Sequence, residues 1–194
     1  MPKPLKHSVL LRKAEMRDIP LISKWSLLPD MALYLVGVPQ MSKTELDQKV
    51  ADQIRAMLRP YPSHLFVMAE TLEGVPFGLI IYRDLDWKNR RVAVEVIIGE
   101  AEYRGKGYGG ESFFAAVEYA FHELNLHKVF AYVYDFNRAS LKLTRLGAGK
   151  KDVVMRKSVL RNGEHSDSIV LSILDSEFPA LVRRVGLAKL MFGK

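Results

Sequence analysis

The stretch Val92-Ala93-Val94-Glu95-Val96-Ile97-Ile98 is followed, after a short polar connection, by Arg104-Gly105-Lys106-Gly107-Tyr108-Gly109-Gly110. The first segment is typical of an apolar strand, and the second leads directly into an amphipathic helix. Glycines reach positive φ at little steric cost and let the backbone approach a ligand closely. The N–H groups of a first helical turn, together with the helix dipole, favour a phosphate. Arg104 and Lys106 add positive charge, so this stretch predicts a site for a phosphorylated ligand.

The composition is that of an ordinary globular protein. The chain has 194 residues, 48% apolar and 26% charged, which is most simply one domain with a substantial core. The absence of cysteine excludes disulfides, thiolate metal sites and a cysteine nucleophile, and it fits a reducing, cytoplasmic location. We expect no signal peptide, because residues 1–11 lack an apolar core, and no membrane span, because no apolar run approaches roughly 18 residues. The histidines lack metal-ligand spacing, so no metal site is expected.

The net charge of +7 is concentrated at the ends of the chain. Residues 1–13 and 178–194 hold eight of the 29 basic residues and no acidic ones, which leaves 21 basic against 22 acidic residues in 14–177. A basic end is more often solubilising or loosely docked than a nucleic-acid site. We therefore expect one domain over 8–178 and a basic amphipathic tail over 179–194. We expect the tail to dock on its own domain; docking on a second subunit or on an acidic partner are the alternatives.

Hydrophobic periodicity outlines the remaining elements. A capping box of Ser42 and Glu45 begins one helix, and Asn162-Gly163 is a strong hairpin signal. Short turns between successive strands indicate hairpins, whereas the later strand–helix–strand order indicates a crossover. The pattern predicts an α/β (α+β) domain with a mixed sheet. Strands are expected at 9–12, 65–71, 76–83, 92–98, 128–134, 153–160 and 168–174, and helices at 19–27, from 43, at 111–125 and at 137–146. The buried stripe of the 111–125 helix is expected to be Phe113, Val117, Ala120, Phe121 and Leu124.

Two other phosphate-binding motifs are alternatives for the glycine stretch. It matches G-x-G-x-x-G, and Asp135 lies where a ribose-binding acid would be expected in a dinucleotide fold. Three features argue against that fold: the loop lies past the middle of the chain, residues 100–103 separate it from the strand, and the preceding strands are joined by short turns. A Walker A loop also fails, because neither Ser nor Thr follows Gly105-Lys106.

The better description of the loop is Arg-x-x-Gly-x-Gly, formed by Arg104, Gly107 and Gly109. With this motif the chain resembles the GNAT N-acetyltransferases, and more narrowly the branch of ribosomal-protein alanine and spermidine acetyltransferases. The resemblance covers roughly residues 8–178. It rests on Leu10-Leu11-Arg12, Asp18 with Lys24-Trp25, the strand at 94–98, the loop at 104–109, Asn137-x-x-Ser140 and Leu146-Gly147.

The resemblance implies a single GNAT-like domain in which acetyl-CoA lies between two parallel strands that splay apart, here 92–98 and 128–134, in a mostly antiparallel sheet flanked by helices. Backbone groups of the first strand would bind the pantetheine arm, and the loop amides would hold the pyrophosphate. Asn137 would also bind the pantetheine arm, and Ser140 would lie near the sulfur. The implied cofactor-binding residues are Val96, Ile97, Ile98, Arg104, Gly105, Lys106, Gly107, Tyr108, Gly109 and Asn137.

The implied reaction is direct transfer of an acetyl group to an amine, which must lose a proton before it attacks. Glu95 is the first candidate base, because apolar strand neighbours would raise its pKa; a salt-bridged strand residue is the competing interpretation. Glu164 is a second candidate, although a solvated turn acid is favoured there. Thr144 occupies the position at which many family members carry a tyrosine acid. Ser140 is therefore the candidate that assists the thiolate, with a plain helix-surface serine as the alternative.

The sequence leaves the acceptor open. A protein N-terminal amine, a polyamine and another small-molecule amine are all consistent with the branch, and a homodimer is an expectation. Two rival functions remain: a coenzyme A sensor without turnover, suggested by Thr144, and a nucleic-acid or ribosome-associated module that uses the basic ends. The second predicts binding that weakens steeply with salt.

Overall fold

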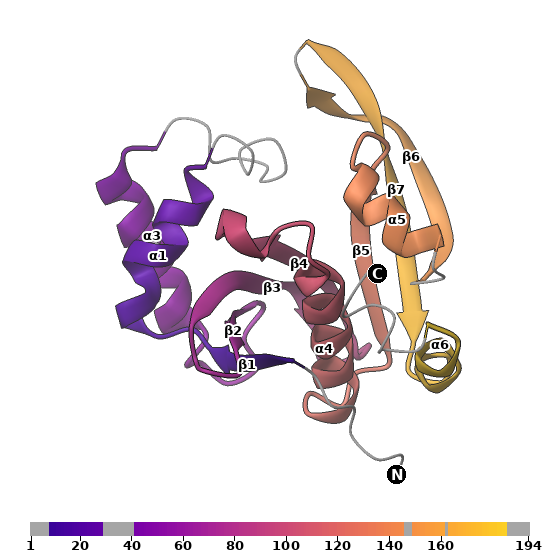
Figure 1. Ribbon diagram of the computed structural model, residues 1–194, viewed down its shortest axis with the longest axis horizontal. Coiled ribbons are helices and arrows are strands. Elements are labelled where there is room, and N and C mark those ends of the chain that lie inside the picture. Colours follow the sequence, from indigo (N-terminus) through magenta and orange to yellow (C-terminus); the bar gives the residue numbers. More distant parts are fainter. Residues whose placement is uncertain (1–7, 29–40, 146–148, 162, 186–194) are drawn as a thin grey trace.

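The computed structural model describes residues 8–28, 41–145, 149–161 and 163–185. Within them, one seven-stranded sheet has the order β1-β2-β3-β4-β5-β7-β6 (Figure 1). Neighbouring strands are antiparallel except for β4 and β5, which are parallel. The predicted α/β domain with a mixed, mostly antiparallel sheet is confirmed. The strands are β1 (Val9–Lys13), β2 (Leu65–Thr71), β3 (Pro76–Asp86), β4 (Arg91–Ile98), β5 (Lys128–Tyr134), β6 (Lys150–Arg161) and β7 (Glu164–Leu174).

Helices cover both faces of the sheet (Figure 1). Helices α1 (Ile19–Ser26) and α3 (Lys43–Ala56) pack on one face, and α4 (Tyr108–His122) packs on the other. Side-chain alternation along β4 separates the two cores, because Val92 and Val94 join the α4 core whereas Ile97 joins the α1–α3 core. The remaining helical elements are η1 (Met16–Asp18), η2 (Ala101–Tyr103), α5 (Arg138–Arg145) and α6 (Phe178–Val185).

Several local signals act as the sequence predicts. The Ser42 hydroxyl accepts from the Glu45 N–H at 3.3 Å, and the Glu45 carboxylate accepts from the Ser42 N–H at 2.8 Å, which completes the capping box of α3. Strands β2, β3 and β4 are joined as antiparallel neighbours, so the short turns are hairpins and a dinucleotide fold is excluded. At the β6–β7 hairpin, Arg161 pairs with Glu164 across residues 162–163; Asn162 lies outside the described residues.

Helix α4 differs from its predicted bounds and stripe. It begins at Tyr108, one turn before the expected Glu111, because Gly107 adopts the left-handed conformation (φ 95°) of its N-cap. Phe114 is 1% exposed, whereas Phe113 and Leu124 are only partly buried. Val117, Ala120 and Phe121 are buried as predicted. The buried stripe is wider than predicted, since α4 packs against β1, β3, β4 and β5 together.

The C-terminal helix α6 docks on the chain's own body, as expected by default. Phe178 and Leu181 belong to the α4 core, and the Phe178 ring lies 5.6 Å from that of Phe121. Residues 186–194 of the basic tail lie outside the described residues, and the domain boundary at 178 stays a prediction.

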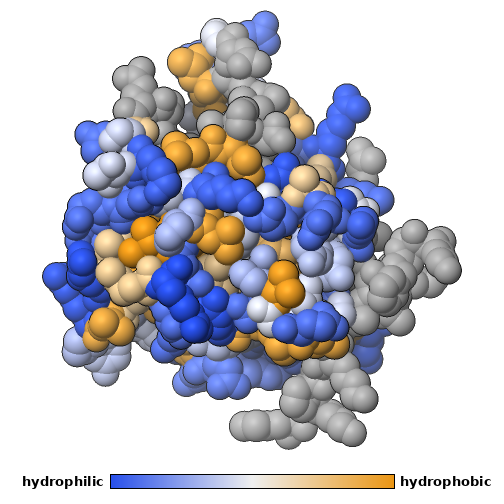
Figure 2. Space-filling view, turned by 60° about the vertical axis from the view of Figure 1, so that its left-hand side comes forward, coloured by the Kyte–Doolittle hydropathy of each residue, from blue (hydrophilic) through white to orange (hydrophobic). Residues whose placement is uncertain are grey.

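The surface mixes charged and apolar residues. In Figure 2, blue hydrophilic side chains surround smaller groups of orange hydrophobic ones. Among the helices of the part of the chain that the structure describes, none combines the length and hydropathy needed to cross a membrane.

Candidate active site

The central feature of the site is an opening between β4 and β5. These parallel strands pair over only three residue pairs, from Arg91 with Lys128 to Ala93 with Phe130. Strand β4 continues to Ile98 against β3, and β5 continues to Tyr134 against β7. The facing backbone edges of 94–98 and 131–134 therefore form no hydrogen-bonded pairs with each other. An extended ligand that carries amide groups fits such an opening in the way an added strand would.

The glycine loop lies at the open end of β4. Gly105 (φ 73°) and Gly107 (φ 95°) adopt left-handed conformations that favour glycine. The first N–H groups of α4 have no acceptor inside the helix, so its N-terminus can bind an anion. A Cβ at Gly109 would lie 3.6 Å from the Ile98 side chain, so the start of α4 sits directly on the end of β4. The anion site predicted from the sequence thus adjoins the opening.

The basic residues of the loop lie in different surroundings. The Arg104 guanidinium donates to the Ile98 carbonyl at 2.9 Å and to the Gly99 carbonyl at 3.0 Å. Its side chain thereby ties the loop back to the end of β4, a role the sequence did not predict. Lys106 is exposed at the loop surface. Of these two side chains, Lys106 is the one placed to meet a phosphate from solvent.

An aromatic cluster supports the loop from beneath. The Tyr103 ring stacks on Phe77 at 4.9 Å, and Tyr108 contacts Phe77 and Tyr103, each at 5.0 Å. Tyr108 therefore packs through its ring. Sequence reasoning missed this cluster, because Phe77 comes from β3 and only the β3–β4 pairing brings it beneath the loop.

Glu95 lies on the α1–α3 face of β4, paired with Ile81 across the strands. The Arg83 Nε donates to the Glu95 Oε1 at 2.8 Å, and their side chains are 41% and 36% exposed. The apolar environment expected for Glu95 is therefore wrong, because the β3–β4 register places a cation beside it. The salt-bridged strand residue, the competing interpretation, describes the observed contact.

An aromatic row of Phe130, Tyr132, Tyr134 and Phe136 continues along β5 and beyond its end. The rings of Phe130 and Tyr132 lie 5.8 Å apart, and those of Tyr134 and Phe136 lie 5.3 Å apart. Because Ala93 pairs with Phe130, alternation places Tyr132 and Tyr134 on the same face as Glu95. Burial raises the pKa of Tyr134, the negative charge of Glu95 raises it further, and Arg83 opposes both effects.

Asn137 and Ser140 are joined at the start of α5. The Asn137 Oδ1 accepts from the Ser140 N–H at 3.1 Å, and the Asn137 carbonyl accepts from the Leu141 N–H at 2.9 Å. Asn137 thus acts as an N-cap, directly after the open part of β5. Ser140 is half-buried in the first turn. The Thr144 side chain and residues 146–148 lie outside the described part, so the missing tyrosine position is known from the sequence alone.

Glu164 is the first residue of β7, at the hairpin turn, and it is exposed. This position agrees with the solvated turn acid favoured from the sequence.

Comparison with known proteins places this geometry in a family. The sequence profile of the Acetyltransferase (GNAT) domain family matches residues 8–148. Over 75 residues, the chain is 37% identical to the probable N-acetyltransferase YjcK of Bacillus subtilis, covering 39% of this chain and 41% of that relative. It is 26% identical over 182 residues to the spermidine N(1)-acetyltransferase of Escherichia coli K12, covering 91% of each.

A solved structure has the same fold. The spermidine N-acetyltransferase from Vibrio cholerae in complex with CoA and spermine aligns with a TM-score of 0.79 at 22% identity, covering 89% of this chain and 98% of that one. The chain spans less than two thirds of YjcK and of the prophage-derived N-acetyltransferase YokL of Bacillus subtilis, 41% and 63% respectively. This chain belongs to the GNAT acetyltransferase family, as its sequence motifs predict.

Proposed function

We propose that this protein is an N-acetyltransferase that transfers an acetyl group from acetyl-CoA directly to a primary amine. The observation that carries the proposal is the opening between β4 and β5, which leads at its wide end to the N-terminus of α4. An opening lined by backbone edges suits the amide-bearing pantetheine arm, and a helix N-terminus suits the pyrophosphate. One continuous surface therefore matches the two chemically different parts of acetyl-CoA.

The residues proposed to hold acetyl-CoA are those that the family resemblance implies, and this geometry supports them. The edge at Val96, Ile97 and Ile98 would pair with the pantetheine arm, and the Asn137 side-chain amide would donate to it from across the opening. The backbone amides of residues 104–109 would bind the pyrophosphate, with Lys106 adding charge from solvent. Acetyl-CoA supplies the acyl group. The chain binds and orients acetyl-CoA and accepts the proton that the amine loses.

Glu95 is assigned the proton transfer, and Ser140 the stabilisation of the departing thiolate. Glu95 would accept the proton of the amine, directly or through a water, and its ion pair with Arg83 fixes the position of the carboxylate. Ser140 would donate a hydrogen bond to the departing thiolate from the first turn of α5. Direct transfer fits a chain without cysteine, because no thiol is present to carry the acetyl group.

A cationic acceptor suits the face on which Glu95 lies. Tyr132 and Tyr134 lie on this face, and aromatic faces attract ammonium groups; the negative charge of Glu95 beside them is shared with Arg83. Two of the similar proteins described above are named spermidine N-acetyltransferases. We therefore rank polyamines first among the acceptors, ahead of protein N-terminal amines and other small amines. The cytoplasmic location and a homodimer stay predictions.

The test begins with the cofactor. Calorimetric titration of acetyl-CoA into the intact protein is expected to give a dissociation constant in the micromolar range. The variant Gly107→Glu, which puts a carboxylate and a Cβ at a left-handed position of the loop, is expected to abolish binding. The absence of binding by the intact protein would overturn the proposal.

Turnover then separates enzyme from sensor. A panel of spermidine, spermine, an N-terminal peptide and an amino sugar is assayed by release of free coenzyme A thiol. Turnover with a polyamine supports the proposed acceptor, and turnover only with another amine replaces it. Tight acetyl-CoA binding with no turnover on any amine identifies the coenzyme A sensor.

A further inference from the structure

The junction between β4 and the glycine loop is held by a helix from a distant part of the chain. Gly99 and Glu100 connect the end of β4 to η2, and α1 brings Trp25 against them. Trp25 is 1% exposed. Three indole atoms would lie 2.2, 2.3 and 2.3 Å from a Cβ built on Gly99, so the ring lies directly against the glycine backbone. A residue with a side chain at position 99 would displace either the indole or the strand end.

A hydrogen bond adds direction to this packing. The Trp25 Nε1 donates to the Glu100 Oε1 at 2.9 Å, and the Lys24 Nζ reaches the same oxygen at 2.7 Å. These two hydrogen bonds, from Lys24 first and then from Trp25, lower the pKa of Glu100, so the carboxylate stays charged at neutral pH. Glu100 is the N-cap residue of η2, the turn that leads into the loop.

The other contacts of the junction come from the site itself. Arg104 donates to the carbonyls of Ile98 and Gly99 from within the loop. The N–H groups of Gly99 and Glu100 both donate to the Phe77 carbonyl of β3, at 2.9 and 3.1 Å. Strand β3 and the loop thus set two sides of the junction, and Trp25 sets the side that faces α1.

We propose that Trp25 is a positioning residue for acetyl-CoA binding, acting through Gly99 and Glu100 to hold the start of the glycine loop. The inference rests on the proposed function, because it takes that loop as the pyrophosphate site. It also links the loop to α1, which lies on the same face of the sheet as Glu95. The packing on Gly99 sets the distance of the junction from α1, and the hydrogen bond to Glu100 sets its orientation.

The chain offers a matched control for this assignment. Its only other tryptophan, Trp87, donates its Nε1–H to the Pro62 carbonyl, also at 2.9 Å. Trp25→Phe and Trp87→Phe therefore make the same chemical change, one beside the loop and one at a backbone carbonyl of another segment. In each variant the remaining tryptophan is the sole indole fluorophore.

The first experiment is calorimetric titration of acetyl-CoA into both variants, with thermal unfolding of each. Trp25→Phe is expected to weaken acetyl-CoA binding by roughly threefold to tenfold, as for other residues that act on a site indirectly. Trp87→Phe is expected to bind as the intact protein does, with a similar unfolding temperature. Equal affinities in the two variants would overturn the proposal. Failure of the intact protein itself to bind would instead overturn the proposed function.

Fluorescence tests whether the surroundings of Trp25 respond to acetyl-CoA. In Trp87→Phe, emission from Trp25 is expected to change with acetyl-CoA and to follow the calorimetric curve. In Trp25→Phe, emission from Trp87 is expected to stay constant. Calorimetric binding to Trp87→Phe without any change in Trp25 emission would contradict the assignment.

A double-mutant cycle tests whether Trp25 acts through Gly99. Gly99→Ala is expected to weaken acetyl-CoA binding more than Trp25→Phe does, because the methyl group drives the indole and the strand end apart. Combined with Trp25→Leu, the effect of Gly99→Ala is expected to shrink, since the two positions share one contact. Additive effects would show that the two residues act separately and would refute the mechanism.

Discussion

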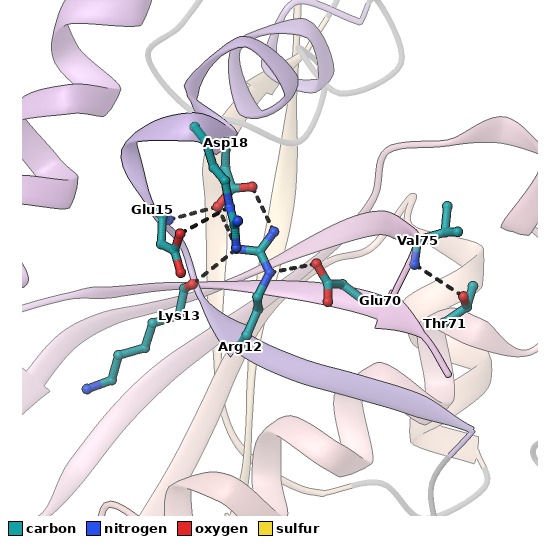
Figure 3. Close-up of polar contacts among 8 residues, drawn as sticks. Arg12, Lys13, Glu15, Asp18, Glu70, Thr71 and Val75 are labelled. Atoms are coloured by element: carbon teal, nitrogen blue, oxygen red, sulfur yellow. Dashed lines mark hydrogen bonds and ion pairs between the residues drawn. The ribbon is translucent and has the colours of Figure 1, made fainter. Parts of the chain in front are cut away.

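At the scale of single residues, Arg12 lies at the centre of an ion-pair network outside the site. Its guanidinium donates two hydrogen bonds to Asp18, at 2.7 and 2.8 Å, and its Nε donates to Glu70 at 2.6 Å (Figure 3). The side chains of Asp18 and Glu70 are only 6% and 12% exposed. One cation on β1 thus bridges two nearly buried carboxylates, one from η1 and one from β2.

Replacing Arg12 should therefore destabilise the fold. Arg12→Ala removes the ion-pair partner of both carboxylates, and we expect the free energy of unfolding to fall by about 3–5 kcal/mol. Arg12→Lys keeps the charge but loses the planar fork, so its loss should be smaller. Urea unfolding measures both. Arg55→Ala, which breaks an exposed pair with Asp52, is the control and should change little. Equal losses for Arg12→Ala and Arg55→Ala would contradict this account.

The same network predicts how stability depends on pH. Burial raises the pKa of Asp18, but the hydrogen bonds from Arg12 and from the Glu15 N–H outweigh it, so the pKa is lowered below its ordinary 3.8. A carboxylate with a lowered pKa in the folded state stabilises the fold above its unfolded pKa, and this contribution is lost as pH falls below about 4. Unfolding free energies measured from pH 7 to pH 3 should therefore drop more steeply for the intact protein than for Arg12→Ala. Parallel curves would refute the assignment.

Glu95 carries the prediction about catalysis. Glu95→Gln keeps the shape of the side chain and removes the base, so kcat should fall by about 100-fold or more. Acetyl-CoA affinity should stay nearly unchanged, because Glu95 lies on the opposite face of β4 from α4. Steady-state kinetics and calorimetry separate the two effects, with Glu123→Gln at an exposed position beyond α4 as the control. Unchanged turnover in Glu95→Gln would remove this residue from the mechanism, and Glu164→Gln would then test the second candidate.

At the scale of elements, α6 completes the core beneath α4. Phe178 and Leu181 are 4% and 5% exposed, and Phe178 packs edge to face on Phe121. Phe178→Ala should lower the free energy of unfolding by about 3–5 kcal/mol, because it leaves a cavity beside Phe121. The exposed Arg183→Ala on the same helix is the control. Thermal or urea unfolding measures both, and a loss in Phe178→Ala no larger than that in Arg183→Ala would show that α6 is dispensable to the core.

Elements were predicted well wherever their signals are local. The sequence periodicity located β5 at its observed bounds, and the Ser42 capping box placed the start of α3 correctly. The start of α4 was placed too late, because Gly109 and Gly110 are poor helix formers. The helix begins earlier because the left-handed Gly107 caps it, and Gly109 packs on the end of β4.

The environment of the site was less predictable than its location. The glycine loop and the splayed strand pair follow from motif and resemblance. The Arg83–Glu95 pair, the Phe77–Tyr103–Tyr108 cluster and the contact of Trp25 with Gly99 each join segments far apart in the sequence. Such contacts depend on sheet register and helix docking, which no local pattern encodes. Cross-strand pairing of a basic with an acidic residue was the one signal that could have suggested the first of them.

At the scale of the whole molecule, the positive charge at the C-terminal end decides how its part in turnover should be tested. Deletion of 178–194 removes the basic end but also takes Phe178 and Leu181 from the core, so it confounds binding with stability. Replacing Arg183, Arg184, Lys189 and Lys194 by Gln removes the charge alone. We expect turnover of a small amine to be unchanged in that variant, measured by thiol release. A large loss of turnover would place the C-terminal charges in the reaction.

The three residue pairs between β4 and β5 have one more consequence. They divide the sheet into two halves, β1-β2-β3-β4 and β5-β7-β6, which are hydrogen-bonded to each other at one end only. Acetyl-CoA bound between the two halves would bridge them as well as react. A ligand bound only by the folded state stabilises that state. The unfolding temperature of this protein should then rise and fall with the concentration of acetyl-CoA.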